Sequence, residues 1–112
     1  MKPKNMIYIA GPMTGIKFNN RAMFFKAEKY LRSAGWRVIS PVRIGAAFGT
    51  DGEIDADVAI RAAVMAAELA VIPLCKAIYL LPGWNASAGA CGELNCAIAN
   101  NLEIVEAGDE LG

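Results

Sequence analysis

Residues 77–81 read A-I-Y-L-L, and the turn dipeptide Pro82-Gly83 follows them directly. A short apolar run that contains β-forming side chains and ends at such a dipeptide predicts a strand. Because every side chain in the run is apolar, the strand is expected to be buried on both faces, as the central strands of parallel sheets are. This stretch therefore predicts a sheet that is covered by helices on both faces.

Strands and helices are expected to alternate along the chain on either side of residues 77–81. Asn19 or Asn20 is expected to cap the first helix, and Gly35 is expected to end it. Residues 42–53 hold three glycines and no sustained periodicity, so they predict a loop with at most one short turn. Strands are predicted at residues 5–10, 36–40 and 102–105, and helices at residues 18–34, 55–74 and 90–101.

This alternation predicts an α/β fold of the flavodoxin- or Rossmann-like type, a three-layer sandwich. We expect a mostly parallel sheet of four to five strands in the order 2-1-3-4. A single domain is expected to span residues 1–112. In the order 2-1-3-4, a crevice opens at the carboxyl ends of strands 1 and 3.

The composition narrows the chemistry that this domain can perform. Apolar residues make up 55% of the 112 residues, which is enough for a core. Eleven Lys and Arg balance eleven Asp and Glu, so the net charge is zero and extended nucleic acid is not an expected partner. The sequence has no histidine, which excludes a Ser-His-Asp triad and most zinc sites. Catalysis must then use carboxylates, hydroxyls, lysines or thiols, and we expect neither a metal ion nor a cofactor.

The cysteines and the apolar segments predict a cytoplasmic protein. Cys75, Cys91 and Cys96 are odd in number and lack C-x-x-C spacing, which argues against a disulfide framework and favours a reducing compartment. No secretory signal is expected at the amino terminus. The most apolar window, residues 62–84, is interrupted by charged residues and prolines, so no membrane contact is expected.

Two loops rich in small residues are expected to meet at the crevice. They are residues 11–15, G-P-M-T-G, and residues 82–89, P-G-W-N-A-S-A-G. Glycines in such loops let a ligand approach the backbone amides. The helix predicted at residues 90–101 adds its unpaired N–H groups, which favour a phosphate or a carboxylate. The candidate ligand contacts are Gly11, Met13, Gly15, Trp84, Ser87 and Gly89.

Glu93 is the candidate nucleophile of the crevice. It is expected in the first turn of the third helix, where the helix dipole would stabilise its ionised form. Acidic residues in first turns are also common as plain dipole partners. Ser87 and the hydroxyl of Tyr8, on the first strand, are expected to converge on Glu93, and this combination suits glycosyl transfer.

Three motifs resemble the nucleoside 2-deoxyribosyltransferase superfamily, and most closely its small DUF4406 branch. They are I-Y-I-A-G-P-M-T-G at residues 7–15, F-N-N-R-A-M-F at residues 18–24 and A-I-Y-L-L-P-G-W-N-A-S-A-G-A-C-G-E at residues 77–93. The likeness covers nearly the whole chain and is weakest across residues 43–58. It implies cleavage or transfer at the N-glycosidic bond of 2′-deoxynucleosides or their 5′-monophosphates, through a covalent glutamyl-deoxyribosyl intermediate.

The resemblance also implies roles for individual residues. Glu93 matches the attacking glutamate, and Tyr8 matches the tyrosine that orients it. Ser87 matches the serine that holds a 5′-phosphate in related deoxynucleoside-monophosphate hydrolases, whereas nucleoside transferases tend to carry an aspartate there. Glu68 falls where an aspartate commonly contacts the base and passes a proton to it. Lys76 stands where an aspartate commonly follows the cysteine.

Several alternatives stay open at the level of the sequence. The acceptor of the sugar is either water, as in a hydrolase, or a second base, as in a transferase. The departures at Glu68 and Lys76 favour an alternative function, a non-catalytic nucleotide-binding or sensing module. A structural protein is a third reading, but it leaves the glycine-rich loops unexplained. Trp84 either stacks on a nucleobase or packs in its own turn.

A homodimer or a higher even oligomer is the expected assembly. A small domain with this many apolar residues leaves apolar surface for a partner. The resembled superfamily also builds its sites at subunit interfaces.

Overall fold

The computed structural model describes residues 5–13, 15–48 and 58–111, and its described strands form one parallel sheet. Its order is β2-β1-β3-β4, so the predicted order 2-1-3-4 is confirmed. Tyr8 of β1 lies opposite Ile39 of β2 and Ile78 of β3, and Ile78 lies opposite Ile104 of β4. The strands are β1 (Met6–Ala10), β2 (Arg37–Ile39), β3 (Ala77–Leu80) and β4 (Glu103–Glu106).

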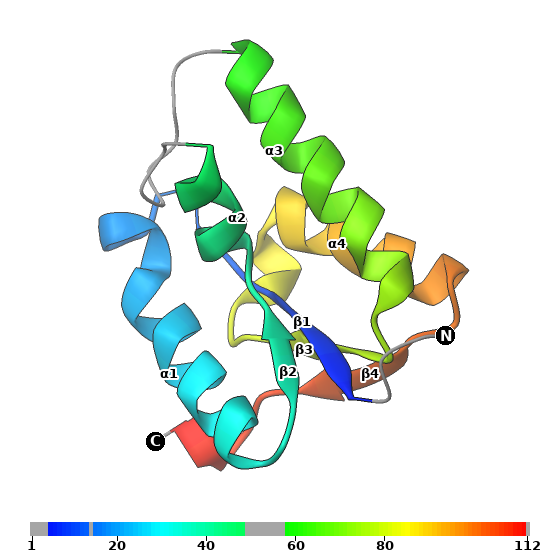
Figure 1. Ribbon diagram of the computed structural model, residues 1–112. Helices are drawn as coiled ribbons and strands as arrows, with labels where there is room; N and C mark the ends of the chain where they lie inside the picture. The colour runs from blue at the N-terminus through cyan, green and yellow to red at the C-terminus, as the bar shows by residue number, and fades with distance from the viewer. Residues whose placement is uncertain (1–4, 14, 49–57, 112) are drawn as a thin grey trace.

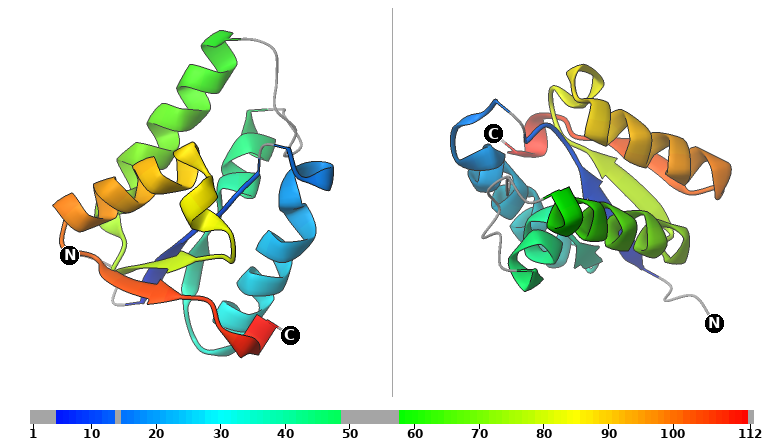
Figure 2. Two further views of the ribbon diagram at one scale, coloured as in Figure 1. Left: turned by 180° about the vertical axis from the view of Figure 1, so that it is seen from behind. Right: turned by 90° about the horizontal axis from the view of Figure 1, so that it is seen from above.

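Helices cover both faces of the sheet, as predicted (Figures 1 and 2). Helix α1 (Arg21–Ser33) packs on one face, and α3 (Val58–Val71) and α4 (Ala88–Ala99) lie on the other. Side chains along a strand alternate between faces, so Ile7 and Ile9 join the core under α1, whereas Tyr8 joins the core under α4. The central strands β1 and β3 are buried, in agreement with their apolar sequences.

The ends of α1 are set by local backbone geometry. Gly35 has φ +96°, a left-handed conformation that favours glycine, and the Trp36 N–H donates to the Leu31 carbonyl at 3.0 Å, so the predicted helix end is confirmed. A short 3-10 turn, η1 (Lys17–Asn20), precedes the helix. Asn20 directly precedes α1 but makes no capping hydrogen bond, because its side-chain amide donates to the Pro12 carbonyl at 3.0 Å. The capping role expected of Asn20 is therefore wrong.

The expected loop at residues 42–53 is also wrong in its first part. Helix α2 (Pro41–Ala47) covers the first six of these positions and the preceding Pro41. The Ser40 hydroxyl accepts a hydrogen bond from the Val42 N–H at 3.3 Å, and Pro41 occupies the first turn, so a start signal is present in the sequence. Residues 49–53 lie outside the described part of the chain.

The other two predicted helices are both present, and residues 55–57, the first positions predicted for α3, lie outside the described part of the chain. Helix α3 begins at Val58 in the described part of the chain, and the 3-10 turn η2 (Ile72–Leu74) follows it. Helix α4 starts at Ala88, two residues earlier than predicted, because the Ser87 hydroxyl accepts from the Ala90 N–H at 3.2 Å and caps it. A further 3-10 turn, η3 (Trp84–Ala86), precedes this cap, and η4 (Asp109–Leu111) ends the described chain.

Among the helices that the structure describes, none has the length and apolar character that crossing a membrane requires.

Candidate active site

The two glycine-containing loops that follow β1 and β3 contact each other. The Leu81 N–H donates to the Ala10 carbonyl at 2.8 Å, which extends the strand pairing to the start of both loops. A Cβ atom added at Gly11 would lie 2.7 Å from Leu81 Cβ, so no side chain fits there. A Cβ atom at Gly83 would lie 3.3 Å from the Pro12 ring. The predicted meeting of the two loops is therefore present.

Three titratable side chains from three elements meet above β1, on the α4 side of the sheet. The Tyr8 hydroxyl donates a hydrogen bond to Glu93 Oε2, and it lies 3.3 Å from Glu68 Oε2. Tyr8 comes from β1 and is fully buried, Glu68 comes from α3, and Glu93 comes from α4. The charge of Glu68 also acts on Glu93, so the two carboxyl groups are electrostatic neighbours. The expected contact of Tyr8 with Glu93 is thus found, and Glu68 joins it.

Burial dominates the electrostatics of this cluster. It raises the pKa of Glu93 from 4.5 to about 8, and the neighbouring charge of Glu68 adds to the increase. Burial likewise raises the pKa of Glu68 to about 7. The hydrogen bond from Tyr8 acts in the opposite direction on both carboxyl groups, and burial holds the pKa of Tyr8 well above its ordinary value. Tyr8 therefore stays a neutral hydrogen-bond donor.

These properties correct the expected environment of Glu93. The sequence predicts Glu93 in a first helical turn that stabilises its ionised form, but α4 starts at Ala88 and Glu93 lies in the second turn. The effect of a helix dipole falls off within the first turn. Burial therefore decides the pKa of Glu93, and it favours the protonated form.

Ser87, Gly89 and Trp84 surround the amino-terminal end of α4. Ser87 caps the helix, and Gly89 is exposed, with the Ser87 hydroxyl 3.9 Å from where its Cβ would lie. The Trp84 ring packs against the core on the α4 side, and its indole N–H donates to Glu106 Oε1 at 3.1 Å. The structure thus brings these three residues to the helix that carries Glu93.

Two predicted ligand contacts of the loop after β1, Met13 and Gly15, lie apart from the Tyr8 cluster. Met13 is half-buried and packs against the core on the α1 side, whereas Tyr8 belongs to the core on the α4 side. Gly15 is exposed, has φ +82° and faces open space. The structure therefore does not bring Met13 and Gly15 to the Tyr8 cluster.

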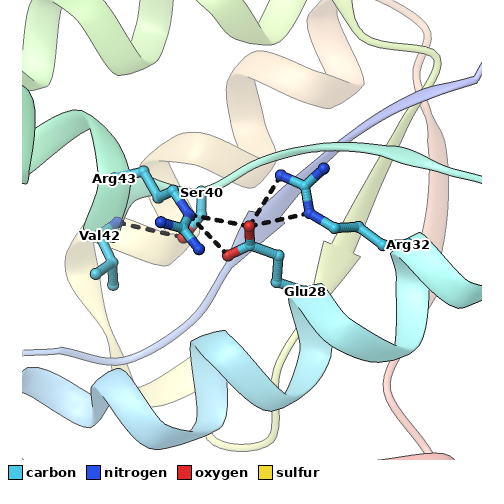
Figure 3. Close-up of polar contacts among 5 residues, drawn as sticks. All are labelled: Glu28, Arg32, Ser40, Val42 and Arg43. Carbon is cyan, nitrogen blue, oxygen red and sulfur yellow. Dashed lines mark hydrogen bonds and ion pairs between the residues drawn. The ribbon is translucent and has the colours of Figure 1, made fainter.

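A second charged cluster was not foreseen from the sequence. Glu28 of α1 is buried, with 5% of its side chain exposed, and it pairs with Arg32 and Arg43 at 2.9 Å each (Figure 3). The spacing of Glu28 and Arg32 is the i,i+4 spacing of a helical ion pair and is visible in the sequence. Arg43 lies on α2, which the sequence analysis expects to be a loop, so this partner carried no signal.

No metal site is evident among residues 5–13, 15–48 and 58–111, because no group of three or more His, Cys, Asp or Glu side chains there could hold an ion. The chemistry open to the Tyr8 cluster is proton transfer and nucleophilic attack by a carboxylate.

Solved structures of 2-deoxyribosyltransferases share this α/β fold. The 2-deoxyribosyltransferase of the psychrotolerant bacterium Bacillus psychrosaccharolyticus, a biocatalyst for nucleoside synthesis, superposes with a TM-score of 0.67 at 20% identity over 90% of this chain and 70% of its own. The 2-deoxyribosyltransferase of Leishmania mexicana superposes with a TM-score of 0.61 at 22% identity over 91% of this chain. The match spans 63% of that enzyme, less than two thirds of its length.

At the level of sequence, the model of the family "Domain of unknown function (DUF4406)" matches residues 5–106. The chain therefore belongs to the DUF4406 family, and its fold is that of the 2-deoxyribosyltransferases. No curated protein matches the sequence.

Proposed function

We propose that the protein cleaves or transfers at the N-glycosidic bond of 2′-deoxynucleosides or their 5′-monophosphates. Glu93 attacks C1′ and forms a covalent glutamyl-deoxyribosyl intermediate, Tyr8 orients Glu93, and Glu68 supplies a proton to the departing base. The observation that carries the proposal is the contact of Glu68 and Glu93 with the single hydroxyl of Tyr8. The shared fold with 2-deoxyribosyltransferases supports the same class of reaction.

The spacing of the two carboxyl groups favours a covalent intermediate. Because both hydrogen-bond to the same phenol oxygen, their nearest oxygens are no farther apart than about 6 Å. Glycosidases that form a glycosyl-enzyme hold their carboxyl groups about 5–5.5 Å apart, whereas inverting enzymes leave about 6.5–9.5 Å for a water molecule. The Glu68–Glu93 pair is therefore too close for the inverting arrangement.

The loops around α4 are proposed to hold the rest of the substrate. The Ser87 hydroxyl accepts from the Ala90 N–H, and its own O–H can still donate to a phosphate or hydroxyl oxygen at the helix terminus. Trp84 is fixed by Glu106 and offers a ring for stacking on a base. The remaining proposed ligand contacts are Gly11, Met13, Gly15 and Gly89.

The test is an assay for base release together with a search for the intermediate. The protein is incubated with a panel of deoxynucleosides and 5′-monophosphates, with and without a second base as acceptor. We expect released base and a deoxyribosyl adduct on Glu93, detected by mass spectrometry, and the acceptor dependence separates a hydrolase from a transferase. Glu93→Gln should abolish both signals, whereas Glu103→Gln, at an exposed position of β4, should preserve them. Absence of release and of adduct across the panel would remove the proposal.

A second function is favoured by the raised pKa of Glu93. A carboxyl group that is mostly protonated near neutral pH is a poor nucleophile, which suits a nucleotide-binding or sensing module without turnover. Such a module would bind a nucleotide and return it intact after prolonged incubation. Binding that is unaltered in Glu93→Gln, with no base released by the wild-type chain, would favour this alternative.

The protein is further proposed to be cytoplasmic and to form a homodimer or a higher even oligomer. Two large side chains on α3 support self-association, since Met65 is 57% exposed and Leu69 is 40% exposed. Cys91 and Cys96 are free thiols, which suits a reducing compartment.

A further inference from the structure

If both carboxyl groups were ionised, the Tyr8 cluster would have only the phenol proton for two contacts with carboxyl oxygens. A phenol has one proton to donate, and an ionised carboxylate only accepts. The single Tyr8 proton is donated to Glu93, so the 3.3 Å contact between the Tyr8 oxygen and Glu68 Oε2 becomes a full hydrogen bond only if Glu68 carries a proton. The observed contacts are satisfied by one additional proton.

No positive group compensates the two carboxyl groups in the described part of the chain. The ion pairs found there belong to Glu28 and leave Glu68 and Glu93 unpaired with a cation. Two half-buried carboxylates beside one phenol, without a cation, repel each other, and holding one proton relieves this repulsion. The geometry and the charge balance therefore agree on a pair with one proton.

From this arrangement we infer that Glu68 and Glu93 hold a single proton between them, and that its transfer from Glu93 to Glu68 prepares both residues for catalysis at once. The inference rests on the proposed function. With the proton on Glu93, the nucleophile is neutral and the acid is ionised. With the proton on Glu68, Glu93 is an ionised nucleophile and Glu68 is a proton donor.

The reaction then conserves the shared proton. As the Oε–C1′ bond to Glu93 forms, the C1′–N bond breaks, its electron pair goes to the base, and the base takes the proton of Glu68. When water adds to C1′, Glu68 accepts a proton from it and Glu93 leaves as a carboxylate. The pair is returned with one proton, and no oxidant, reductant or metal is involved.

The hydrogen bond from Tyr8 sets the direction of the proton transfer. The length of the Glu68 side chain keeps this acid within reach of Tyr8. The hydrogen bond from Tyr8 favours the ionised form of Glu93 and thereby the competent state. Glu68 Oε2 already lies 3.3 Å from the Tyr8 oxygen, and an aspartate would fall short by one C–C bond of about 1.5 Å. Glu68→Asp is therefore not a conservative change here, because it separates the acid from the other two groups.

Three elements supply the groups that shift the pKa values of this pair. Tyr8 comes from β1, Glu68 from α3 and Glu93 from α4, and the charges and side-chain hydrogen bonds that shift their pKa values are those of one another. On the same helices, Cys96 donates to the Leu69 carbonyl, Cys91 donates to the Trp84 and Asn85 carbonyls, and Arg61 lies two turns before Glu68. The pH dependence of the reaction is thus attributed to the pair.

The first experiment counts the proton directly. Infrared difference spectroscopy between neutral and alkaline pH should show loss of the band of one protonated carboxyl group in the wild-type chain. Glu68→Gln and Glu93→Gln should each alter this band, whereas Glu103→Gln should leave it unchanged. A spectrum without a protonated carboxyl group at neutral pH would overturn the inference, and this result does not depend on turnover.

The second experiment tests the use of the proton. Glu68→Gln should slow base release by about 10²- to 10⁴-fold, remove the alkaline limb of the kcat/KM profile, and recover on 4-nitrophenyl 2-deoxyriboside, whose leaving group departs without a proton. Tyr8→Phe should shift the acidic limb of the profile to higher pH, because Glu93 loses its donor. Glu68→Asp should resemble Glu68→Gln on natural bases.

The outcomes separate this inference from the proposed function. If the wild-type chain releases base but Glu68→Gln is not restored by the activated leaving group, the shared proton is overturned and glycosidic cleavage stands. If no substrate is cleaved while the infrared band is present, the pair holds its proton and the proposed function fails.

Discussion

At the scale of single residues, Glu93 shows which properties the local sequence predicts and which it does not. The sequence predicts that Glu93 and Tyr8 come together, because the first strand and the third helix flank the same strand in the order 2-1-3-4. It does not predict the pKa of Glu93, because burial depends on α3, which packs beside α4 and supplies Glu68. A pKa that depends on side chains from three elements cannot be predicted from the residues around one of them.

The raised pKa values of this pair predict a pH-dependent stability. The folded pKa values of about 8 for Glu93 and about 7 for Glu68 lie above the ordinary value of 4.5. The folded protein then binds more protons than the unfolded chain, so the free energy of unfolding should fall as the pH rises from about 4.5 to about 8. The decrease should be on the order of a few kcal/mol.

Urea unfolding at several pH values measures this decrease. The double variant Glu68→Gln/Glu93→Gln should show a much flatter dependence, since neither side chain can ionise. A free energy of unfolding that stays constant or rises across this window in the wild-type chain would contradict the assignment of a buried, protonated pair.

Gly11 gives a second prediction at this scale. A Cβ atom there would lie 2.7 Å from Leu81 Cβ and 2.8 Å from Leu81 Cδ1, so Gly11→Ala forces the two loops apart. We expect the free energy of unfolding to fall by about 1–3 kcal/mol, as for other overpacked sites. The matched control is Gly92→Ala in α4, where nothing lies within 4 Å, and it should raise stability by about 0.5–1 kcal/mol. Equal effects of the two changes in chemical denaturation would refute the packing argument.

At the scale of elements, Ser87 has a structural task and a proposed functional task that can be separated. Ser87→Ala removes the cap of α4 and should lower the free energy of unfolding by about 1 kcal/mol. Ser87→Asp keeps an acceptor for the Ala90 N–H and should restore this stability. Its charge repels a phosphate, so KM for 5′-monophosphates should rise while KM for deoxynucleosides changes little. If both KM values stay unchanged in Ser87→Asp, Ser87 is only a cap.

The ion pairs of Glu28 connect two elements, and their two arginines should contribute unequally (Figure 3). Arg43 of α2 contacts both carboxyl oxygens of Glu28 and lies over the Phe25 ring, whereas Arg32 is a neighbour within α1. Arg43→Ala should lower the free energy of unfolding by about 1–2 kcal/mol, and Arg32→Ala by about 0.5 kcal/mol or less. A larger effect of Arg32→Ala in denaturant titrations would show that α2 is not held by this pair.

Helix α2 also shows why the sequence did not predict one of the helices. Ser40 and Pro41 are the capping residue and the first-turn proline of a helix start. The glycines that follow, Gly45 among them, outweighed this signal because glycine is a poor helix former. The buried Gly45, Pro41 and Val42 show that tertiary packing stabilises the helix.

At the scale of the whole molecule, the parallel sheet and its strand order were predictable, because alternating strands and helices allow few topologies. The layered packing follows from the side chains of β1, which alternate between the two cores. Contacts between side chains of distant elements could be predicted only where the fold places the ends of two strands together. The pairing of Glu28 with Arg43 and the joining of Glu68 to Tyr8 depend on helix positions that no local pattern specifies.

Assembly is the last property at this scale, and α3 locates the expected interface. Ala62, Met65, Ala66 and Leu69 follow one helical stripe and are exposed, with Met65 at 57% and Leu69 at 40%. Apolar stripes of this kind mark contacts with a partner, and their small residues allow two helices to approach closely. We therefore expect light scattering to give the mass of a dimer or a higher even oligomer at micromolar concentration. Met65→Lys/Leu69→Lys should give the monomer mass, whereas Ile104→Lys, on the edge strand β4, should not. A monomeric wild-type chain contradicts self-association, and an unchanged mass in the double variant places the interface away from α3.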